Sequence, residues 1–87
     1  MKFYVYIIYS NKFDKYYKGF TQDVQKRLEN HNSGKSRYTK NFLPWELVFL
    51  QSFETKTEAL IREKKLKKYS KTQIIELINS NKNLLLN

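Results

Sequence analysis

One acidic residue, Glu63, stands where a helix would direct it toward apolar side chains. At about 100° per residue, a helix over residues 57–68 places Glu63 on the same side as Ala59, Leu60 and Leu66. A carboxylate on such a face is costly unless a cation, a metal ion or hydrogen-bond donors lie opposite it. We therefore expect another part of the chain to supply a partner for Glu63.

A helix over residues 21–32 places two polar side chains beside an apolar seam. Its i, i+3, i+4, i+7 face consists of Val24, Arg27, Leu28 and His31. An arginine in this position can hold a phosphate bidentately and stays charged at ordinary pH. Two alternatives remain open: Arg27 forms a structural salt bridge with Glu63, and His31 is a packing residue.

The remaining patterns predict the element order strand, strand, helix, strand, helix, helix. The first strand, residues 3–9, has one face of Phe3, Val5, Ile7 and Tyr9 and another of Tyr4, Tyr6 and Ile8. Turn residues at 11–14 connect it to a second strand at 15–20, which predicts an antiparallel hairpin. Thr21 is predicted to cap the first helix, with Asp23 in its first turn, and residues 32–34 to end it.

The second half of the chain has clear helix starts. A third strand is predicted at residues 45–53, and the pairs Thr55 with Glu58 and Ser70 with Gln73 have capping-box spacing. We predict a single α+β domain over residues 1–80 and a frayed tail over residues 81–87. The three leucines of the tail could alternatively pack or mediate self-association.

The composition favours one compact domain with a polyanionic partner. The chain has 87 residues, with 17 Lys plus Arg against 8 Asp plus Glu, so its net charge is +9. Nucleic acid is the favoured partner because neutralising phosphates releases counterions; the alternative is that lysine only maintains solubility. The absence of cysteine excludes disulfides and thiolate metal sites. Because no segment has the roughly 20 apolar residues of a membrane span, we expect a cytoplasmic protein.

Residues 35–44 have no period and mix cations with aromatic rings, a combination suited to phosphates and unstacked bases. The predicted nucleic-acid contacts are Lys35, Arg37, Tyr38 and Lys40 in this loop, with Lys18 and Lys67 outside it. Alternatively, the segment is a solvated loop with Phe42 packed into the core.

The motifs occur in a distinctive order along the chain. They are Tyr4-Val5-Tyr6, Tyr17-Lys18-Gly19, Thr21, Arg27, His31, Tyr38-Thr39, Pro44-Trp45 and the segment at residues 58–63. This ordered set resembles the signature of the GIY-YIG nuclease family, and in particular its short, stand-alone bacterial branch. Tyr4 and Lys18 depart from the usual glycine and isoleucine of the two name-giving motifs.

The resemblance implies a three-stranded antiparallel sheet flanked by helices and an endonuclease that cleaves DNA with one divalent cation, Mg2+ or Mn2+. It implies Glu63 as the metal ligand, Arg27 at the scissile phosphate, and Tyr6 and Tyr17 lining the site. One tyrosine would act on the attacking water as a base or through a hydrogen bond, and His31 would be a further site residue.

The same residues leave several functions open. Gly19 would let a backbone or a phosphate approach closely, and a tyrosine with a pKa of about 10 is a poor base unless a cation lowers it. We expect branched or damaged DNA as substrate, with RNA left open and a partner protein supplying specificity. The alternatives are a non-catalytic nucleic-acid-binding module with the same fold, and a protein-interaction subunit that docks through its leucine tail.

Overall fold

The sheet has three strands, and its central strand is the first in the sequence. The computed structural model describes residues 1–86. Its strands are β1 (Phe3–Ser10), β2 (Lys15–Thr21) and β3 (Glu46–Phe53), in the order β2-β1-β3 with both pairs antiparallel. Asp14, in the turn between β1 and β2, has a positive φ of 52°, which aspartate tolerates better than most residues. The predicted hairpin and third strand are therefore confirmed.

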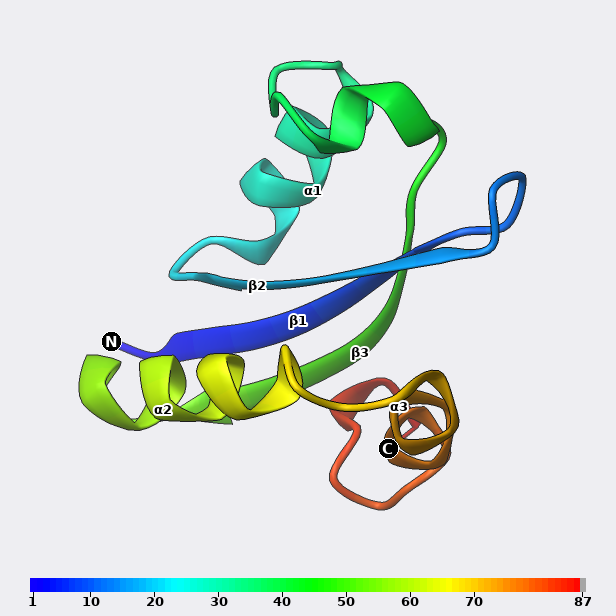
Figure 1. Ribbon diagram of the computed structural model, residues 1–87. Helices are drawn as coiled ribbons and strands as arrows, with labels where there is room; N and C mark the ends of the chain where they lie inside the picture. Colours follow the sequence, from blue (N-terminus) through cyan, green and yellow to red (C-terminus); the bar gives the residue numbers. More distant parts are fainter. Residues whose placement is uncertain (87) are drawn as a thin grey trace.

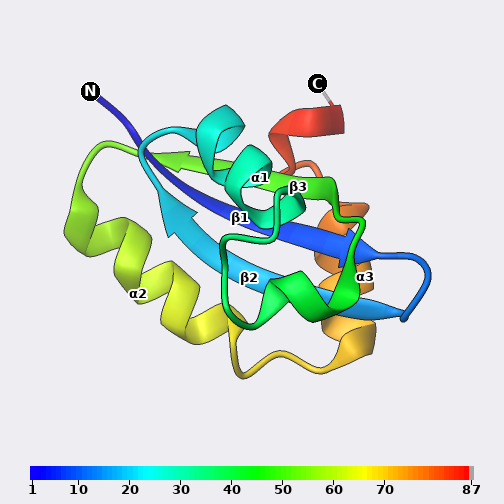
Figure 2. The same ribbon diagram turned by 90° about the horizontal axis from the view of Figure 1, so that it is seen from above.

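The helices cover the two faces of this sheet (Figures 1 and 2). They are α1 (Val24–Asn32), α2 (Lys56–Leu66) and α3 (Lys71–Ile78), and short 3-10 turns lie at Thr39–Phe42 and Leu84–Leu86. α1 and the turn at Thr39–Phe42 lie on one face, and α2 and α3 lie on the other.

The alternation along β1 divides the interior into two clusters, as its pattern predicts. Val5 and Ile7 pack with residues of α2 and α3, whereas Tyr6 and Ile8 pack with Trp45 and with partly buried residues of α1 and the Thr39–Phe42 turn. The period of two in an extended strand thus sends neighbouring residues to different helical layers.

The start of α1 differs from the prediction. Asp23 is the N-cap, since its extended backbone lets its carboxylate accept a hydrogen bond from the Lys26 amide at 3.1 Å. Thr21 is instead the last residue of β2, and its hydroxyl accepts a bond from the Asp23 amide at 3.1 Å. The helix ends as predicted, with Ser33 as C-cap and Gly34 at a φ of 80°.

The two later helices have the predicted caps. Ser70 and Gln73 form both halves of a capping box. Thr55 caps α2, but its hydroxyl donates to the Glu58 carboxylate, so the reciprocal bond to the backbone is replaced by a contact between side chains. The prediction that Leu60 faces the core is wrong. Its side chain is 40% exposed because it lies about 100° around the helix from buried Ala59.

The end of the chain is held against β3, so the expectation of a frayed tail is wrong at residues 83–86. Asn83 is fully buried, and its amide donates to the carbonyls of Val48 (2.9 Å) and Ile78 (2.8 Å). Its side-chain oxygen accepts from the Leu50 amide at 3.2 Å. The leucines at 84–86 remain substantially exposed, and residue 87 lies outside the described residues.

Within residues 1–86, no helix combines the length and the apolar character that crossing a membrane requires.

Candidate active site

The position of Tyr6 depends on Gly19, its partner on the neighbouring strand. Tyr6 is 2% exposed and pairs with Gly19 across β1 and β2. A β carbon added to Gly19 would lie 2.3 Å from the Tyr6 hydroxyl oxygen. The Tyr6 ring therefore occupies the space above Gly19 and extends toward β2. The space left by the missing side chain of Gly19 is thus filled by the Tyr6 ring, and the close approach of a backbone or a phosphate to Gly19 stays a prediction.

Helix α1 directs two polar groups at the Tyr6 hydroxyl. Arg27 Nε donates to it at 3.3 Å, and His31 Nε2 lies 2.8 Å from it. The Tyr17 ring meets the His31 ring edge-on, with 5.1 Å between centroids. The polar stripe predicted for this helix is thus correct, and it brings Tyr6, Tyr17, Arg27 and His31 to one place.

Thr39, which contacts His31, was not predicted as a site residue. His31 Nδ1 is 2.8 Å from the hydroxyl of Thr39, and both residues are fully buried. The carbonyl of Thr39 accepts a bond from the Trp45 indole at 2.8 Å. These bonds connect Tyr6, His31 and Thr39 in one line. In the sequence, the Tyr38-Thr39 motif could have indicated Thr39 as a candidate site residue, but not which residue it contacts.

The surroundings keep Tyr6 and His31 uncharged near neutral pH. Burial raises the pKa of Tyr6 to about 12 against the opposing effect of Arg27. Burial, together with the nearby charge of Arg27, lowers the pKa of His31 to about 4. Burial alone would also lower the pKa of Arg27, but its contacts with Tyr6 and Tyr17 outweigh this and raise it. A neutral His31 has one donor and one acceptor nitrogen, so it relays hydrogen bonding between Tyr6 and Thr39.

Glu63 reaches this group from α2, on the far side of the sheet. α2 runs beside β2 in Figure 2, and Glu63 has a side chain that is only 19% exposed. Its negative charge contributes to the raised pKa of Tyr6, so the carboxylate lies within electrostatic reach of that hydroxyl. Among residues 1–86 its ion pair is with Lys67, at 3.5 Å, and not with Arg27. The alternative of a structural Arg27–Glu63 salt bridge is therefore wrong.

The donor set around Glu63 fits a divalent cation held by one protein ligand. In the described part of the chain, no three acidic, histidine or cysteine side chains are gathered into a metal site. Magnesium keeps several of its waters and is commonly bound by one or two carboxylates together with substrate phosphates. Glu63 meets that requirement, and the neighbouring Lys67 side chain is 58% exposed, so its ammonium can turn into solvent.

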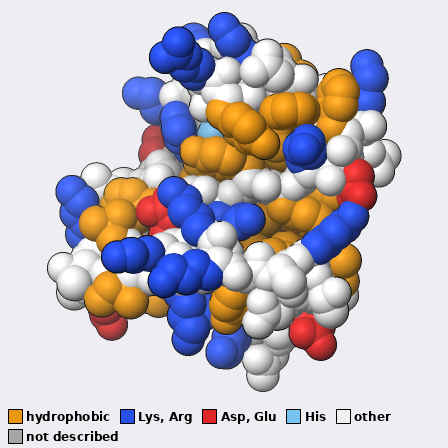
Figure 3. All heavy atoms as spheres, viewed as in Figure 1, with side chains coloured by type: hydrophobic (Ala, Val, Ile, Leu, Met, Phe, Trp, Pro, Cys, Tyr) orange, Lys and Arg blue, Asp and Glu red, His pale blue; other side chains and the backbone are white. Residues whose placement is uncertain are grey.

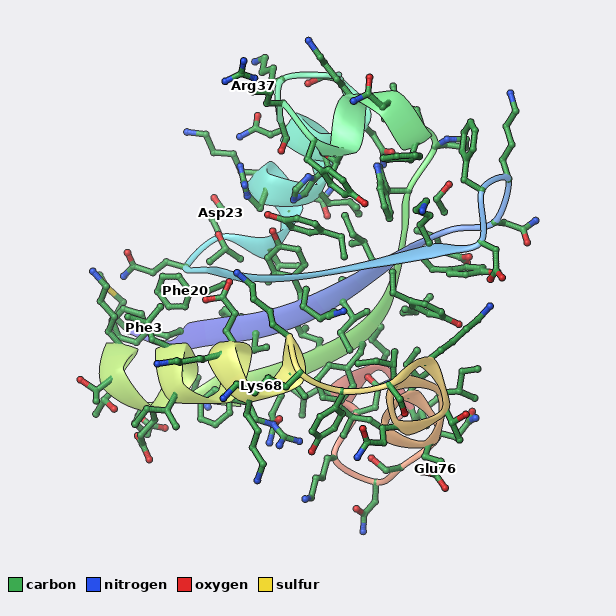
Figure 4. All side chains as sticks on the ribbon, in the orientation of Figure 1. Phe3, Phe20, Asp23, Arg37, Lys68 and Glu76 are labelled. Carbon is green, nitrogen blue, oxygen red and sulfur yellow. The ribbon has the colours of Figure 1, made fainter. Side chains whose placement is uncertain are left out.

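The predicted nucleic-acid contacts fall into two groups. Lys18 is half-buried, and burial and the charge of Lys67 lower its pKa. Figure 3 shows Lys and Arg side chains gathered over the middle of the face that it views. The loop cations Lys35, Arg37 and Lys40 are exposed, and Arg37 points away from the sheet in Figure 4. The contacts of the loop cations with nucleic acid stay a prediction.

The two aromatic rings of the loop behave differently. Tyr38 is 50% exposed and stacks on Tyr17, with centroids 6.1 Å apart and planes at 27°. Phe42 packs against the cluster that contains Tyr6 and Trp45. Phe42 is thus a core residue, as one alternative predicted, whereas Tyr38 presents an aromatic face beside the site.

Comparison with known proteins places this chain in a family. A model of the GIY-YIG catalytic domain matches residues 2–79, and the chain belongs to that family, which has a nuclease-type fold. A UPF0213 protein of Staphylococcus saprophyticus is 39% identical over 79 residues, covering 90% of this chain and 95% of the relative. A UPF0213 protein of Syntrophus aciditrophicus is 41% identical over 83 residues, covering 92% and 93% respectively.

A solved structure supports the same assignment. The solution NMR structure of a UPF0213 protein from Bacillus halodurans is 34% identical, with a TM-score of 0.60 over 98% of this chain and 90% of that one. The predicted membership of the short, stand-alone branch is therefore confirmed.

Proposed function

We propose that the protein is a metal-dependent endonuclease that hydrolyses phosphodiester bonds in branched or damaged DNA. The observation that carries this proposal is the grouping of the Tyr6 hydroxyl with Tyr17, Arg27 and Glu63. These residues come from two strands, β1 and β2, and from two helices, α1 and α2, on opposite faces of the sheet. A structural role for the Tyr6 hydroxyl would require neither an arginine bonded to it nor a partly buried acid whose charge acts on it from the other face of the sheet.

Phosphodiester hydrolysis needs a positioned water, neutralisation of the growing charge and stabilisation of the leaving oxygen. Glu63 would hold Mg2+ or Mn2+, and the bound cation would neutralise charge on the phosphate. Arg27 supplies a second, permanent positive charge beside Tyr6. These two groups account for the electrostatic part of the reaction.

Tyr6 orients the water through a hydrogen bond. With a pKa of about 12 its hydroxyl keeps its proton, so in this state it is not a base. When neutral His31 accepts that proton in a hydrogen bond and donates from Nδ1 to Thr39, the Tyr6 oxygen is left as an acceptor for Arg27 and for a water. Tyr17 closes the site beside the His31 ring.

The second candidate is a non-catalytic nucleic-acid-binding module. It is favoured by the net charge of +9 and by lysines that surround the site without being needed for chemistry. Such a module needs the cations but has no use for a partly buried acid next to them, since the acid repels phosphate. The effect of replacing Glu63 therefore distinguishes a nuclease from a binding module.

The test is Glu63→Gln, assayed on flap, junction, duplex and single-stranded DNA and on RNA, with Mg2+, Mn2+ or chelator. We expect cleavage to fall by at least about 100-fold, because several kcal/mol of charge stabilisation are lost with the cation, while binding in chelator changes little. Glu76→Gln is the matched control, since Glu76 is exposed and points outward from α3. Wild-type cleavage by Glu63→Gln would refute the role of the acid, and binding without cleavage by the wild type would favour the binding module.

A further inference from the structure

A groove lies along the exposed edge of the sheet next to the site. It has a volume of about 290 Å³ and runs between β2 and the start of α3. We define the β2-edge groove by its three lysines and three tyrosines: Lys15, Tyr16, Lys18, Tyr38, Tyr69 and Lys71. Ligand pockets in proteins begin at about 300 Å³, so the groove accommodates a group no larger than one nucleotide.

The groove is continuous with the candidate active site through two of its residues. Tyr38 lines the groove and also stacks on Tyr17 of the site. Lys18 lines the groove and is close enough to Lys67, the partner of Glu63, for the two charges to interact. A strand of nucleic acid whose phosphate lies between Arg27 and Glu63 would therefore have its neighbouring nucleotide at this groove.

The charges in the groove favour a phosphate. Its one acidic residue, Asp14, already forms an ion pair with Lys71. Among residues 1–86, Lys15 and Lys18 form no ion pair. Lys18 is half-buried, where an incoming phosphate would offset the loss of hydration. In Figure 3, Lys and Arg side chains stand beside hydrophobic surface in this part of the molecule.

The aromatic rings favour a base that is not stacked in a duplex. Tyrosine rings contact the face of a base only when the base is free of its neighbours, whereas a duplex presents mainly its phosphates to a surface. Tyr38 is 50% exposed, so its ring is available for such a contact. Tyr16 and Tyr69 pack against the core, so Tyr38 is the ring of the groove that can meet a base. A groove that only tracked a duplex backbone would gain nothing from this exposed ring.

We propose that the β2-edge groove binds one unpaired nucleotide adjacent to the scissile phosphodiester, so that the preferred substrate is DNA with a single-stranded segment at the cleavage point. This inference rests on the proposed nuclease function, because it takes the phosphate position from that site. It adds the subsite that selects the DNA structure, and it assigns Lys15, Lys18 and Tyr38 to substrate binding.

The experiment measures DNA binding by fluorescence anisotropy in chelator, where no cleavage takes place. The probes are a blunt duplex, the same duplex with a single-stranded overhang, and that overhang with abasic sites in place of its bases. We expect the wild type to bind the overhang probe at least about fivefold more tightly than the other two, the gain from one stacked base. Tyr38→Ala should remove this preference while leaving blunt-duplex binding nearly unchanged.

Two double variants that each remove two lysines, one pair inside the groove and one pair outside it, test the role of the groove cations. Lys15→Ala with Lys18→Ala should weaken overhang binding and reduce its salt dependence by about 1.5 units of log–log slope, because each phosphate contact contributes about 0.7–0.9. The control, Lys26→Ala with Lys56→Ala, removes two exposed lysines outside the groove and should weaken all probes equally. Equal binding of the three probes by the wild type, or equal effects of the two double variants, would overturn the subsite.

The binding experiments and the Glu63→Gln cleavage assay can refute the subsite and the nuclease function independently. Loss of cleavage in Glu63→Gln together with equal binding of all probes would refute the subsite alone. A preference for the overhang together with unchanged cleavage in Glu63→Gln would refute the catalytic assignment alone.

Discussion

The ring and hydroxyl of Tyr6 fill the space that a side chain on Gly19 would occupy. A β carbon at Gly19 would lie 2.3 Å from the hydroxyl oxygen and 2.4 Å from Cζ. Contacts that short do not occur between unbonded heavy atoms, and Tyr6 is held by Arg27 and His31. The glycine is thus required for the position of the tyrosine and not for the conformation of its own backbone.

Gly19→Ala should therefore damage the site and the fold together. Displacing a buried, hydrogen-bonded ring by overpacking costs about 1–3 kcal/mol of unfolding free energy, and we expect cleavage to be lost. Urea unfolding and a cleavage assay measure the two effects. In a Tyr6→Leu background the same change should cost at least about 1 kcal/mol less, because the clash is gone.

Gly34→Ala is the control for that substitution. Gly34 has a φ of 80°, but the nearest atom to its added β carbon is 3.9 Å away, so the change strains the backbone by about 1–2 kcal/mol without touching the site. It should destabilise the protein and keep cleavage. Wild-type stability and activity in Gly19→Ala would show that the packing described here is wrong.

Thr39→Val should impair cleavage although Thr39 touches no substrate. The substitution preserves shape but removes the hydroxyl that pairs with His31 Nδ1 at 2.8 Å. Leaving that buried nitrogen unpaired costs about 1–3 kcal/mol, and His31 loses the partner that selects its tautomer. We expect a lower kcat with little change in KM.

Thr39→Ser provides the check on Thr39→Val, since it retains the hydroxyl. It should recover most of the lost kcat. If valine and serine variants cleave equally well, the hydroxyl has no part in positioning His31.

The stability of the protein should decrease in mild acid because of His31. Its pKa is about 4 in the folded protein and about 6.5 as a free side chain, so between these values the unfolded chain binds the extra proton. The unfolding free energy is then at its full value above about pH 6.5 and falls by on the order of 3 kcal/mol as the pH drops to about 4. Denaturant titrations across this range measure the decrease.

Comparing a His31 variant with the wild type separates the contribution of His31 to the pH dependence of stability from that of the carboxylates. His31→Gln keeps a polar side chain but removes the titrating ring, so its unfolding free energy should depend less on pH between 4 and 6.5. Parallel curves for variant and wild type would mean that His31 is protonated as easily in the folded state as in the unfolded one.

Lys67→Met should strengthen the interaction of Glu63 with a divalent cation. The Lys67 ammonium lies 3.5 Å from the Glu63 carboxylate and competes for it. Because the lysine of this pair is exposed, the ion pair contributes only about 0.2–1 kcal/mol. The Mg2+ concentration for half-maximal cleavage should fall by about two- to fivefold. The KM for DNA should rise, since a cation near the phosphate is lost.

Lys64→Met removes the same charge from the exposed side of the same helix. It should leave the Mg2+ requirement unchanged. A higher Mg2+ requirement in Lys67→Met would indicate that Lys67 assists the metal site.

Local patterns were enough to predict most of the elements. The two faces of β1, the stripe of Arg27 and His31 on α1, and the Ser70 capping box all follow from short-range sterics and hydrogen bonds. The order of the motifs predicted the family. Errors arose where two local solutions compete, as with Thr21 and Asp23 for the cap of α1, or where a helix position lies at the margin of its buried arc, as with Leu60.

Long-range relationships were decided only by the tertiary structure. Tyr6 and His31 are 25 residues apart, and Asn83 contacts Val48 from 35 residues away. The charge of Glu63, on α2, contributes to the raised pKa of Tyr6, on β1. The sequence by itself determined which side chains could do chemistry and which face of each element they occupy. Which of them meet depended on the packing of α1 and α2 around β1 and β2, because a buried hydrogen bond is specified by the positions of both partners and not by the pattern around either one.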